Sequence, residues 1–237
     1  MKVAMHGVRA LATCAALLLA SCRTTPPVAA PGAGIGPGAA PAASVLYTID
    51  DAASRVLVLV YREGPMAALG HNHVMNVREL RGTVQLFDEL PRSRFELAFP
   101  VAGISVDEPA LRTAAGADFS STVGEMARTG TRNNMLGERQ LQATRFASIT
   151  LLSELVSETA DGGLLVATRI NVRGQDFHVD IPLRLQRSDE GLVANGEFRI
   201  RQSALGLTPF SVMLGALRVA DEMTVQFRLV AHRVRLQ

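Results

Sequence analysis

The chain has 237 residues, 48% of them hydrophobic and 19% charged, so it is long and apolar enough to fold around a buried core. Its formal net charge of +2 comes from Lys2 and Arg9, and the acidic and basic residues of the remaining chain balance. This balance and the lack of tryptophan argue against a nucleic-acid-binding protein. Lys2 is the only lysine, which excludes lysine Schiff-base catalysis in the rest of the chain.

Residues 1–21 have the composition of an export signal. A basic start is followed by an apolar run at 10–20 that is too short to span a bilayer. The run ends in Leu19-Ala20-Ser21-Cys22, which resembles the bacterial lipobox, a motif whose cysteine is lipidated after cleavage. An ordinary cleaved signal is the alternative. Arg23 does not resemble the usual inner-membrane retention signal, so the expected location is the periplasmic side of the envelope, with a lipid anchor in the outer membrane.

Residues 22–44 are rich in alanine, proline and glycine. This composition buries little surface and predicts a flexible tether after the lipidated Cys22. Patterns typical of β-strands begin at residue 45. The folded domain is therefore expected over residues 45–237.

Short β-branched and alternating runs, separated by turn residues, fill most of this domain. Residues 107–137 differ, because Pro109 suits a first helical turn and Ser120–Thr122 offers a cap for a short helix over 123–128. The expected strands cover residues 46–49, 55–62, 71–78, 82–88, 94–101, 147–158, 164–172, 177–186, 195–201 and 222–232.

Apolar residues alternate clearly along several of these strands. Odd-numbered positions from 177 to 185 and from 223 to 231 each form one apolar face, as do 95, 97 and 99. The pattern shows no alternation of strands with helices, which disfavours a parallel sheet. The sequence predicts an all-β fold, an antiparallel lipocalin-like barrel of about eight strands with a short helical insertion. A barrel of this size can hold one elongated small ligand.

Several short motifs, in order, resemble those of the YceI-like family of exported bacterial proteins. The resemblance covers residues 45–232. Its motifs are Tyr47-Thr48-Ile49-Asp50 with Ser54, Arg132-Asn133-Asn134-Met135-Leu136, Phe146-Ala147-Ser148-Ile149-Thr150, Asn171-Val172-Arg173-Gly174, Val179-Asp180-Ile181-Pro182-Leu183, and Arg199-Ile200-Arg201-Gln202-Ser203-Ala204-Leu205-Gly206.

The resemblance implies a barrel with an interior tunnel that binds an isoprenoid-type or quinone-type lipid. It also implies no general catalytic apparatus, a possible homodimer, and a possible cytochrome b-type partner in the membrane. The chain departs from the family pattern in two places. Met135 stands where a histidine is frequent, and Leu69-Gly70-His71-Asn72-His73 replaces an aromatic-rich segment. Both departures fall at possible ligand-contacting positions.

The His71 and His73 pair allows three interpretations. Two residues apart on a strand, both imidazoles would face the same way. They could form a hydrogen-bonded polar pair at the barrel mouth, contact the polar head of a ligand, or bind a divalent metal with His178 as a third ligand. His178 lies opposite the apolar face of its strand, so it points outward if that face lines the interior. The alternative function is accordingly a periplasmic metal-binding protein.

Four further residues are candidate ligand contacts. Arg132 and Arg201 could each grip a phosphate or carboxylate, or simply pair with acidic groups at the surface. Asn134 could contact a ligand or cap a turn, and Met135 could line a pliable lipid pocket or pack in the core. No nucleophile motif is present, and the sequence places no carboxylate near the histidine pair, so we expect a binding protein and not an enzyme.

Overall fold

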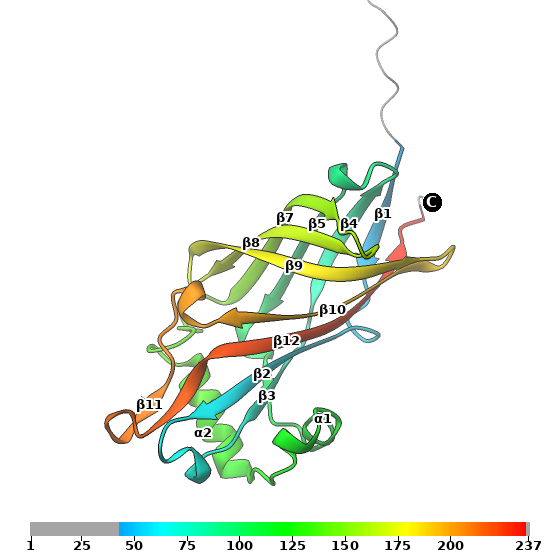
Figure 1. Ribbon diagram of the computed structural model, residues 1–237. Helices are drawn as coiled ribbons and strands as arrows, with labels where there is room; N and C mark the ends of the chain where they lie inside the picture. Colours follow the sequence, from blue (N-terminus) through cyan, green and yellow to red (C-terminus); the bar gives the residue numbers. More distant parts are fainter. Residues whose placement is uncertain (1–42, 236–237) are drawn as a thin grey trace, which may run out of the picture. The chain divides into compact units, whose positions relative to one another are not determined.

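The computed structural model describes residues 43–235, in which β-strands predominate (Figure 1). The predicted export signal, Cys22 and nearly all of the predicted tether lie outside the described residues. No helix within 43–235 is long and apolar enough to cross a membrane.

The strands are β1 (Ser44–Ile49), β2 (Arg55–Glu63), β3 (His73–Val77), β4 (Arg81–Phe87), β5 (Arg94–Pro100), β6 (Ser105–Val106), β7 (Ser148–Glu158), β8 (Leu164–Val172), β9 (Gln175–Arg187), β10 (Gly191–Arg201), β11 (Ser211–Val212) and β12 (Leu217–Arg233). Two α-helices, α1 (Pro109–Ala114) and α2 (Glu125–Leu136), lie between β6 and β7. The 3-10 turns are η1 (Ala67–Leu69), η2 (Leu90–Arg92), η3 (Val101–Gly103), η4 (Ala117–Phe119), η5 (Ser203–Leu205) and η6 (Met213–Gly215).

Eight strands form a closed antiparallel ring in the order β1-β4-β5-β7-β8-β9-β10-β12. The ring closes where β1 pairs with the end of β12, with Tyr47 opposite Arg233 and Ile49 opposite Ala231. Along its earlier part, β12 pairs instead with β2, which continues through β3 to β6. The predicted all-β antiparallel barrel with a short helical insertion is therefore confirmed.

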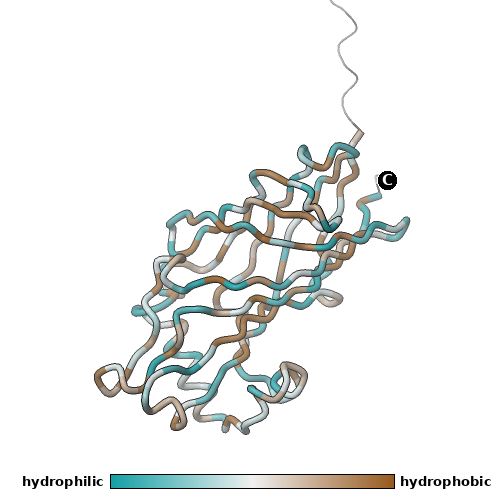
Figure 2. Tube along the Cα trace, viewed as in Figure 1, coloured by the Kyte–Doolittle hydropathy of each residue, from teal (hydrophilic) through white to brown (hydrophobic). Residues whose placement is uncertain are grey.

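Strand alternation determines which side chains fill the barrel. In β12, the five alternate residues from Met223 to Ala231 all line the interior, and in β5 Phe95, Leu97 and Phe99 do the same. Most of the intervening residues of these strands carry charged or polar groups, such as Glu96 and Arg228. Figure 2 shows the resulting change between hydrophobic and hydrophilic positions along the strands. The alternation predicted from the sequence is thus confirmed by the side-chain positions.

Strands β9 and β10 pair with each other over only part of their length. Pairing runs from Leu192 opposite Arg187 to Asn195 opposite Arg184. The next residues of β9 toward its start include Pro182, which has no N–H to donate to a neighbouring strand. Within the described chain, β9 and β10 are not paired beyond this point, and they diverge in Figure 1.

The helical insertion differs from its prediction in one respect. Pro109 does occupy the first turn of α1, after Glu108 as N-cap. The helix predicted at 123–128 is present, but α2 follows Gly124 and extends to Leu136, so the predicted cap at Ser120–Thr122 and the predicted helix ends are wrong. The reason is burial: Phe119, only 2% exposed, packs with Leu57 and other apolar side chains and holds the preceding segment in the turn η4.

Gly82 lies inside β4, where it pairs opposite Leu97 of β5. A Cβ at this position would lie 2.1 Å from the backbone oxygen of Glu96. We therefore predict that Gly82→Ala lowers the free energy of unfolding by about 1–3 kcal/mol in urea denaturation. Gly130→Ala is the control, because nothing lies within 4 Å of its Cβ and alanine favours the helix. Equal stability of the two variants would contradict this packing.

Candidate functional site

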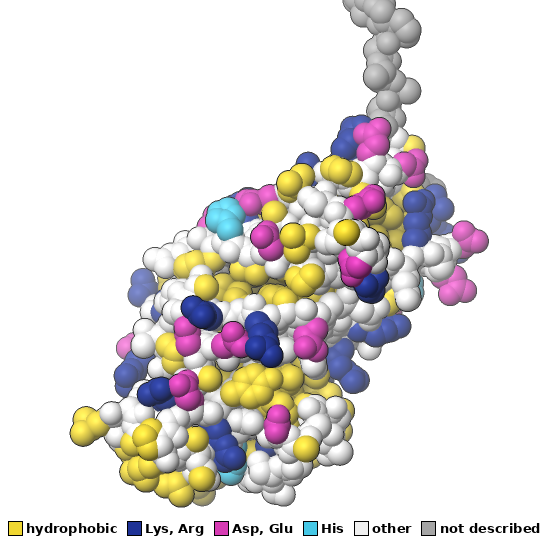
Figure 3. All heavy atoms as spheres, viewed as in Figure 1, with side chains coloured by type: hydrophobic (Ala, Val, Ile, Leu, Met, Phe, Trp, Pro, Cys, Tyr) yellow, Lys and Arg dark blue, Asp and Glu magenta, His cyan; other side chains and the backbone are white. Residues whose placement is uncertain are grey.

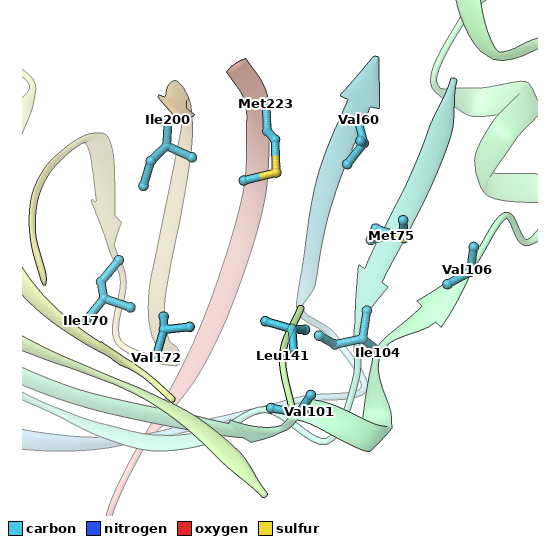
Figure 4. Close-up of a cluster of buried hydrophobic side chains, with 10 residues drawn as sticks. All are labelled: Val60, Met75, Val101, Ile104, Val106, Leu141, Ile170, Val172, Ile200 and Met223. Carbon is cyan, nitrogen blue, oxygen red and sulfur yellow. The ribbon is translucent and has the colours of Figure 1, made fainter. Parts of the chain in front are cut away.

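The barrel interior holds two adjoining apolar cavities. One, of about 340 Å³, lies beside α2 and is called here the α2-side cavity. The other, of about 170 Å³, lies toward the β1–β12 closure and is called the β1-side cavity. Hydrophobic side chains make up nearly all of both walls. Figure 4 shows part of the α2-side wall, where Val60, Met75, Ile170, Ile200 and Met223 come together from five strands.

The two cavities share six wall residues, which we call the waist. They come from six different strands around the barrel and are Val56, Val77, Phe99, Leu151, Phe198 and Val225. The ring of Phe198 packs edge-on against Phe227, with ring centroids 6.5 Å apart. Because the same side chains border both cavities, one elongated apolar molecule that passes the waist would occupy both.

Polar side chains are unevenly distributed between the cavities. Five line the α2-side cavity, namely His73, Thr131, Asn134, Gln140 and Gln202. In the β1-side cavity the polar residues are Ser93 and Arg94, and both already hydrogen-bond to nearby backbone: the Ser93 hydroxyl accepts from the N–H of Phe87, and Arg94 donates to the carbonyl of Pro91. The α2 end is therefore the polar end of the interior.

The strongest polar feature at this end is the contact between His73 and Asp107. His73 is the first residue of β3, and its Nδ1 lies 2.6 Å from Oδ2 of Asp107. The other carboxylate oxygen of Asp107 accepts from Nη1 of Arg112 at 2.6 Å and from the backbone N–H of Val74 at 2.9 Å. The side chain of Asp107 is fully buried, and those of Arg112 and His73 are 5% and 15% exposed.

Arg112 is held by backbone as well as by Asp107. Its Nη1 also donates to the carbonyl of Asn72 at 2.6 Å, and its Nη2 donates to the carbonyl of Ser121 at 2.9 Å. The side chain of Asn72 in turn accepts from the N–H of Arg62 and donates to the carbonyl of Asp118. Arg112 thus fixes the stretch before β3 to the helical insertion.

These contacts keep Asp107 ionised. Burial by itself raises the pKa of this carboxyl, but hydrogen bonds from His73, Val74 and Arg112 hold the pKa below its usual range. An ionised Asp107 accepts a proton-bearing Nδ1, so the uncharged His73 ring has its lone pair on Nε2. Within residues 43–235 the ring hydrogen-bonds only through Nδ1, and His73 lines the α2-side cavity. Its remaining nitrogen is therefore free for a ligand.

The structure separates the predicted site residues into two groups. His73, Asn134 and Met135 line the α2-side cavity. His71, Arg132 and Arg201 do not line either cavity: Arg132 donates to the carbonyl of Ala102, and Arg201 is exposed on β10. Neither arginine is placed to grip a ligand inside the barrel.

The predicted three-histidine metal site is not formed. His71 precedes β3 and lies edge-on to His73, with ring centroids 6.5 Å apart. His178 is exposed on the outer face of β9, where its Nδ1 lies 3.0 Å from Glu154. The inward apolar face of β9 is the reason that His178 points away. Across the part of the chain that the structure describes, no three His, Cys, Asp or Glu side chains gather in a way that could hold a metal ion.

Sequence reasoning missed Asp107 and Arg112 as partners of His73. The expectation of no nearby carboxylate was wrong, because the two-residue strand β6 pairs with β3 and brings Asp107 back beside it. Asp107 has φ +54°, a left-handed conformation that aspartate tolerates better than most residues. The acidic residue directly before Glu108-Pro109 was the available signal, but its position in the sequence does not indicate a contact with β3.

No protein-family model matches the sequence, and no curated protein matches it. Solved structures do match the fold. BcnA of Burkholderia cenocepacia superposes with a TM-score of 0.57 at 14% identity, over 77% of this chain and 98% of BcnA. The fold is YceI-like.

A second match is a polyisoprenoid binding domain from Saccharophagus degradans implicated in plant cell wall breakdown. Its TM-score is 0.52 at 13% identity, over 80% of this chain and 99% of that domain. The predicted resemblance to YceI-like barrels is therefore confirmed for the fold. At such identities, the residues facing the interior need not be shared, so the role of the site depends on this chain's own side chains.

Proposed function

We propose that this YceI-like barrel binds one elongated apolar ligand of the isoprenoid or quinone type. The tail would pass the waist into the β1-side cavity, and the polar head would lie beside His73. The observation that carries the proposal is the pair of adjoining apolar cavities whose polar groups gather at one end, around His73. The polyisoprenoid binding of a domain with the same fold supports it. Affinity would come mainly from burial of the tail, at about 25 cal/mol per Å².

The proposal includes a cellular location for the protein. Export through residues 1–21 and lipidation of Cys22 would anchor it on the periplasmic side of the envelope, in the outer membrane. Its role there would be to carry the ligand and not to transform it. Pairing into a homodimer and contact with a cytochrome b-type membrane protein remain predictions from the resemblance.

The chemistry of His73 suggests which head group is preferred. With Nδ1 engaged by Asp107, the uncharged ring offers a hydrogen-bond acceptor at Nε2. A ligand whose head carries a hydroxyl, such as a prenyl alcohol or a quinol, can donate to it. The corresponding methyl ether cannot, and it would leave Nε2 without a partner inside an apolar cavity.

We predict that the purified protein takes up a long prenyl alcohol, and that it binds the methyl ether of the same alcohol about tenfold more weakly. In His73→Phe, which keeps an aromatic ring without the acceptor, this preference should disappear while the ether still binds. Native mass spectrometry of both proteins with ligand supplied from detergent micelles measures both affinities. Arg201→Gln, on the outer surface, is the control and should behave as wild type. Failure of wild type to bind either compound would contradict the proposed function.

A further inference from the structure

A hydrophobic hairpin extends from the rim of the α2-side cavity. Phe210 and Val219 both line this cavity, and the N–H of Val219 donates to the carbonyl of Phe210 at 2.9 Å. Beyond this bond, β11 pairs with the start of β12, and the turn η6 joins them. The hairpin therefore begins in the cavity wall and projects away from it, at the lower left in Figure 1.

The end of this hairpin is apolar and exposed. Leu214 is fully exposed, and Met213 and Val212 are 57% and 38% exposed. A fourth exposed side chain, Leu69 of η1, belongs to the adjoining segment, which is joined to the hairpin by a hydrogen bond from the N–H of Met66 to the carbonyl of Ala216. We call Leu69, Val212, Met213 and Leu214 the apolar tip. Figure 2 shows the hairpin end as hydrophobic, and Figure 3 shows its side chains protruding from the surface.

The backbone of the tip is also unusual. Met213 and Leu214 have φ of +53° and +56°, in the left-handed region that bulky residues seldom adopt. Asparagine or glycine would fit these positions with less strain. Large apolar side chains are therefore present where both exposure and backbone conformation disfavour them, which is typical of a functional constraint.

We infer that the apolar tip inserts into the surface of a lipid bilayer and brings the mouth of the α2-side cavity against it. Four side chains on a narrow hairpin offer a few hundred Å² at most, well below the roughly 800 Å² per partner of a stable protein interface. Insertion into a bilayer needs no such matching surface, because each apolar side chain contributes by its own burial. The tip also adjoins the polar end of an apolar cavity, where a lipid could move between membrane and barrel. This last role rests on the proposed function, whereas the membrane contact does not.

A single engineered tryptophan tests the contact locally, since the chain has none of its own. We expect Leu214→Trp in the full chain to show a shift of its emission to shorter wavelength with vesicles of phosphatidylethanolamine and phosphatidylglycerol. Bromine-labelled acyl chains in these vesicles should quench it. Leu155→Trp, at a site 51% exposed on β7, is the matched control and should show neither effect. Because the readout is local, a lipid anchor elsewhere on the chain does not produce it.

A second variant tests the tip without adding an apolar group. Met213→Asn with Leu214→Asn should preserve the fold, since asparagine tolerates the left-handed conformation. We expect it to take up a prenyl alcohol from these vesicles at least about tenfold more slowly, because two inserting side chains are lost. Uptake from detergent micelles should be unchanged.

The possible outcomes separate the two proposals. A tryptophan at 214 that stays in water when vesicles are present overturns membrane insertion, whether or not the barrel binds prenyl alcohol from micelles. Equal uptake rates from vesicles in the asparagine variant and wild type overturn the role of the tip in transfer. A protein that binds no prenyl alcohol from micelles contradicts the proposed function, and the quenching result still decides whether the tip enters the bilayer.

Discussion

Replacing Asp107 with asparagine should lower the free energy of unfolding by about 3–5 kcal/mol at neutral pH. The change keeps the size of the side chain and its tolerance of a positive φ, but it removes the charge that Arg112 faces at 2.6 Å. Arg112 is nearly fully buried, so its charge would be left without a counter-charge in the protein interior. Urea denaturation of wild type and variant measures the difference.

The double variant Asp107→Asn with Arg112→Met is the matched control. It removes both charges, and a buried ion pair replaced by uncharged groups commonly loses much less stability than a pair broken on one side. Arg112→Met also removes the donors to the carbonyls of Asn72 and Ser121, so the double variant is not cost-free. Its loss of stability should still be clearly smaller than the sum of the two single losses, a coupling that a double-mutant cycle measures directly. Additive losses would show that the two side chains do not depend on each other.

The contribution of Asp107 should also depend on pH in a defined direction. Its pKa is lowered in the folded protein, so the folded state favours the ionised form of Asp107 more than the unfolded chain does. The stabilisation is fully present above the unfolded pKa, about 3.9, and is lost as the pH falls through the lower folded pKa. The stability difference between wild type and Asp107→Asn should hence be largest near neutral pH and shrink in acid. A difference that grows in acid would contradict the contacts described.

Blocking the waist should separate long ligands from short ones. Val225 borders both cavities from β12, and Val225→Phe would place a ring between them. A prenyl chain long enough to reach the β1-side cavity should then bind about a hundredfold more weakly, since a few methylene-sized groups at about 0.8 kcal/mol each would lose their burial. A single-isoprene alcohol, which needs only the part of the α2-side cavity away from the waist, should lose far less affinity.

Gln226→Phe is the control for this change. It adds the same ring to the same strand one residue later, where the side chain points to the other face of the sheet. Native mass spectrometry with prenyl alcohols of increasing length would show how affinity depends on chain length in both variants. If Val225→Phe lost affinity for short and long alcohols equally, the two cavities would not act as one tunnel.

Much of the barrel was predictable because strand alternation is a local property. The apolar faces of β5, β9 and β12 follow from every second residue, and so does the outward direction of His178. The start of α2 was not predictable in this way. Its position depends on the burial of Phe119 against side chains from β2 and β3. This contact joins distant segments, so the hydroxyl residues at 120–122 cannot predict it.

The candidate site was predictable only in part. A histidine pair in place of aromatic residues drew attention to His73, and the middle motif pointed to Asn134 and Met135, which line the same cavity. The partners Asp107 and Arg112 were missed because they approach His73 through the pairing of a two-residue strand. The arginines at 132 and 201 have the right chemistry for an anionic head group, but their strand or helix positions turn them away from the interior.

Mass spectrometry can identify lipids extracted from the protein purified from its native envelope. We expect a long isoprenoid-type molecule, an alcohol or quinol, at close to one per barrel in wild type. Val225→Phe purified in the same way should have lost it, and Gln226→Phe should have kept it. A wild-type protein that carries no apolar molecule, or a Val225→Phe variant that carries the same one in the same amount, would contradict ligand binding along the barrel interior.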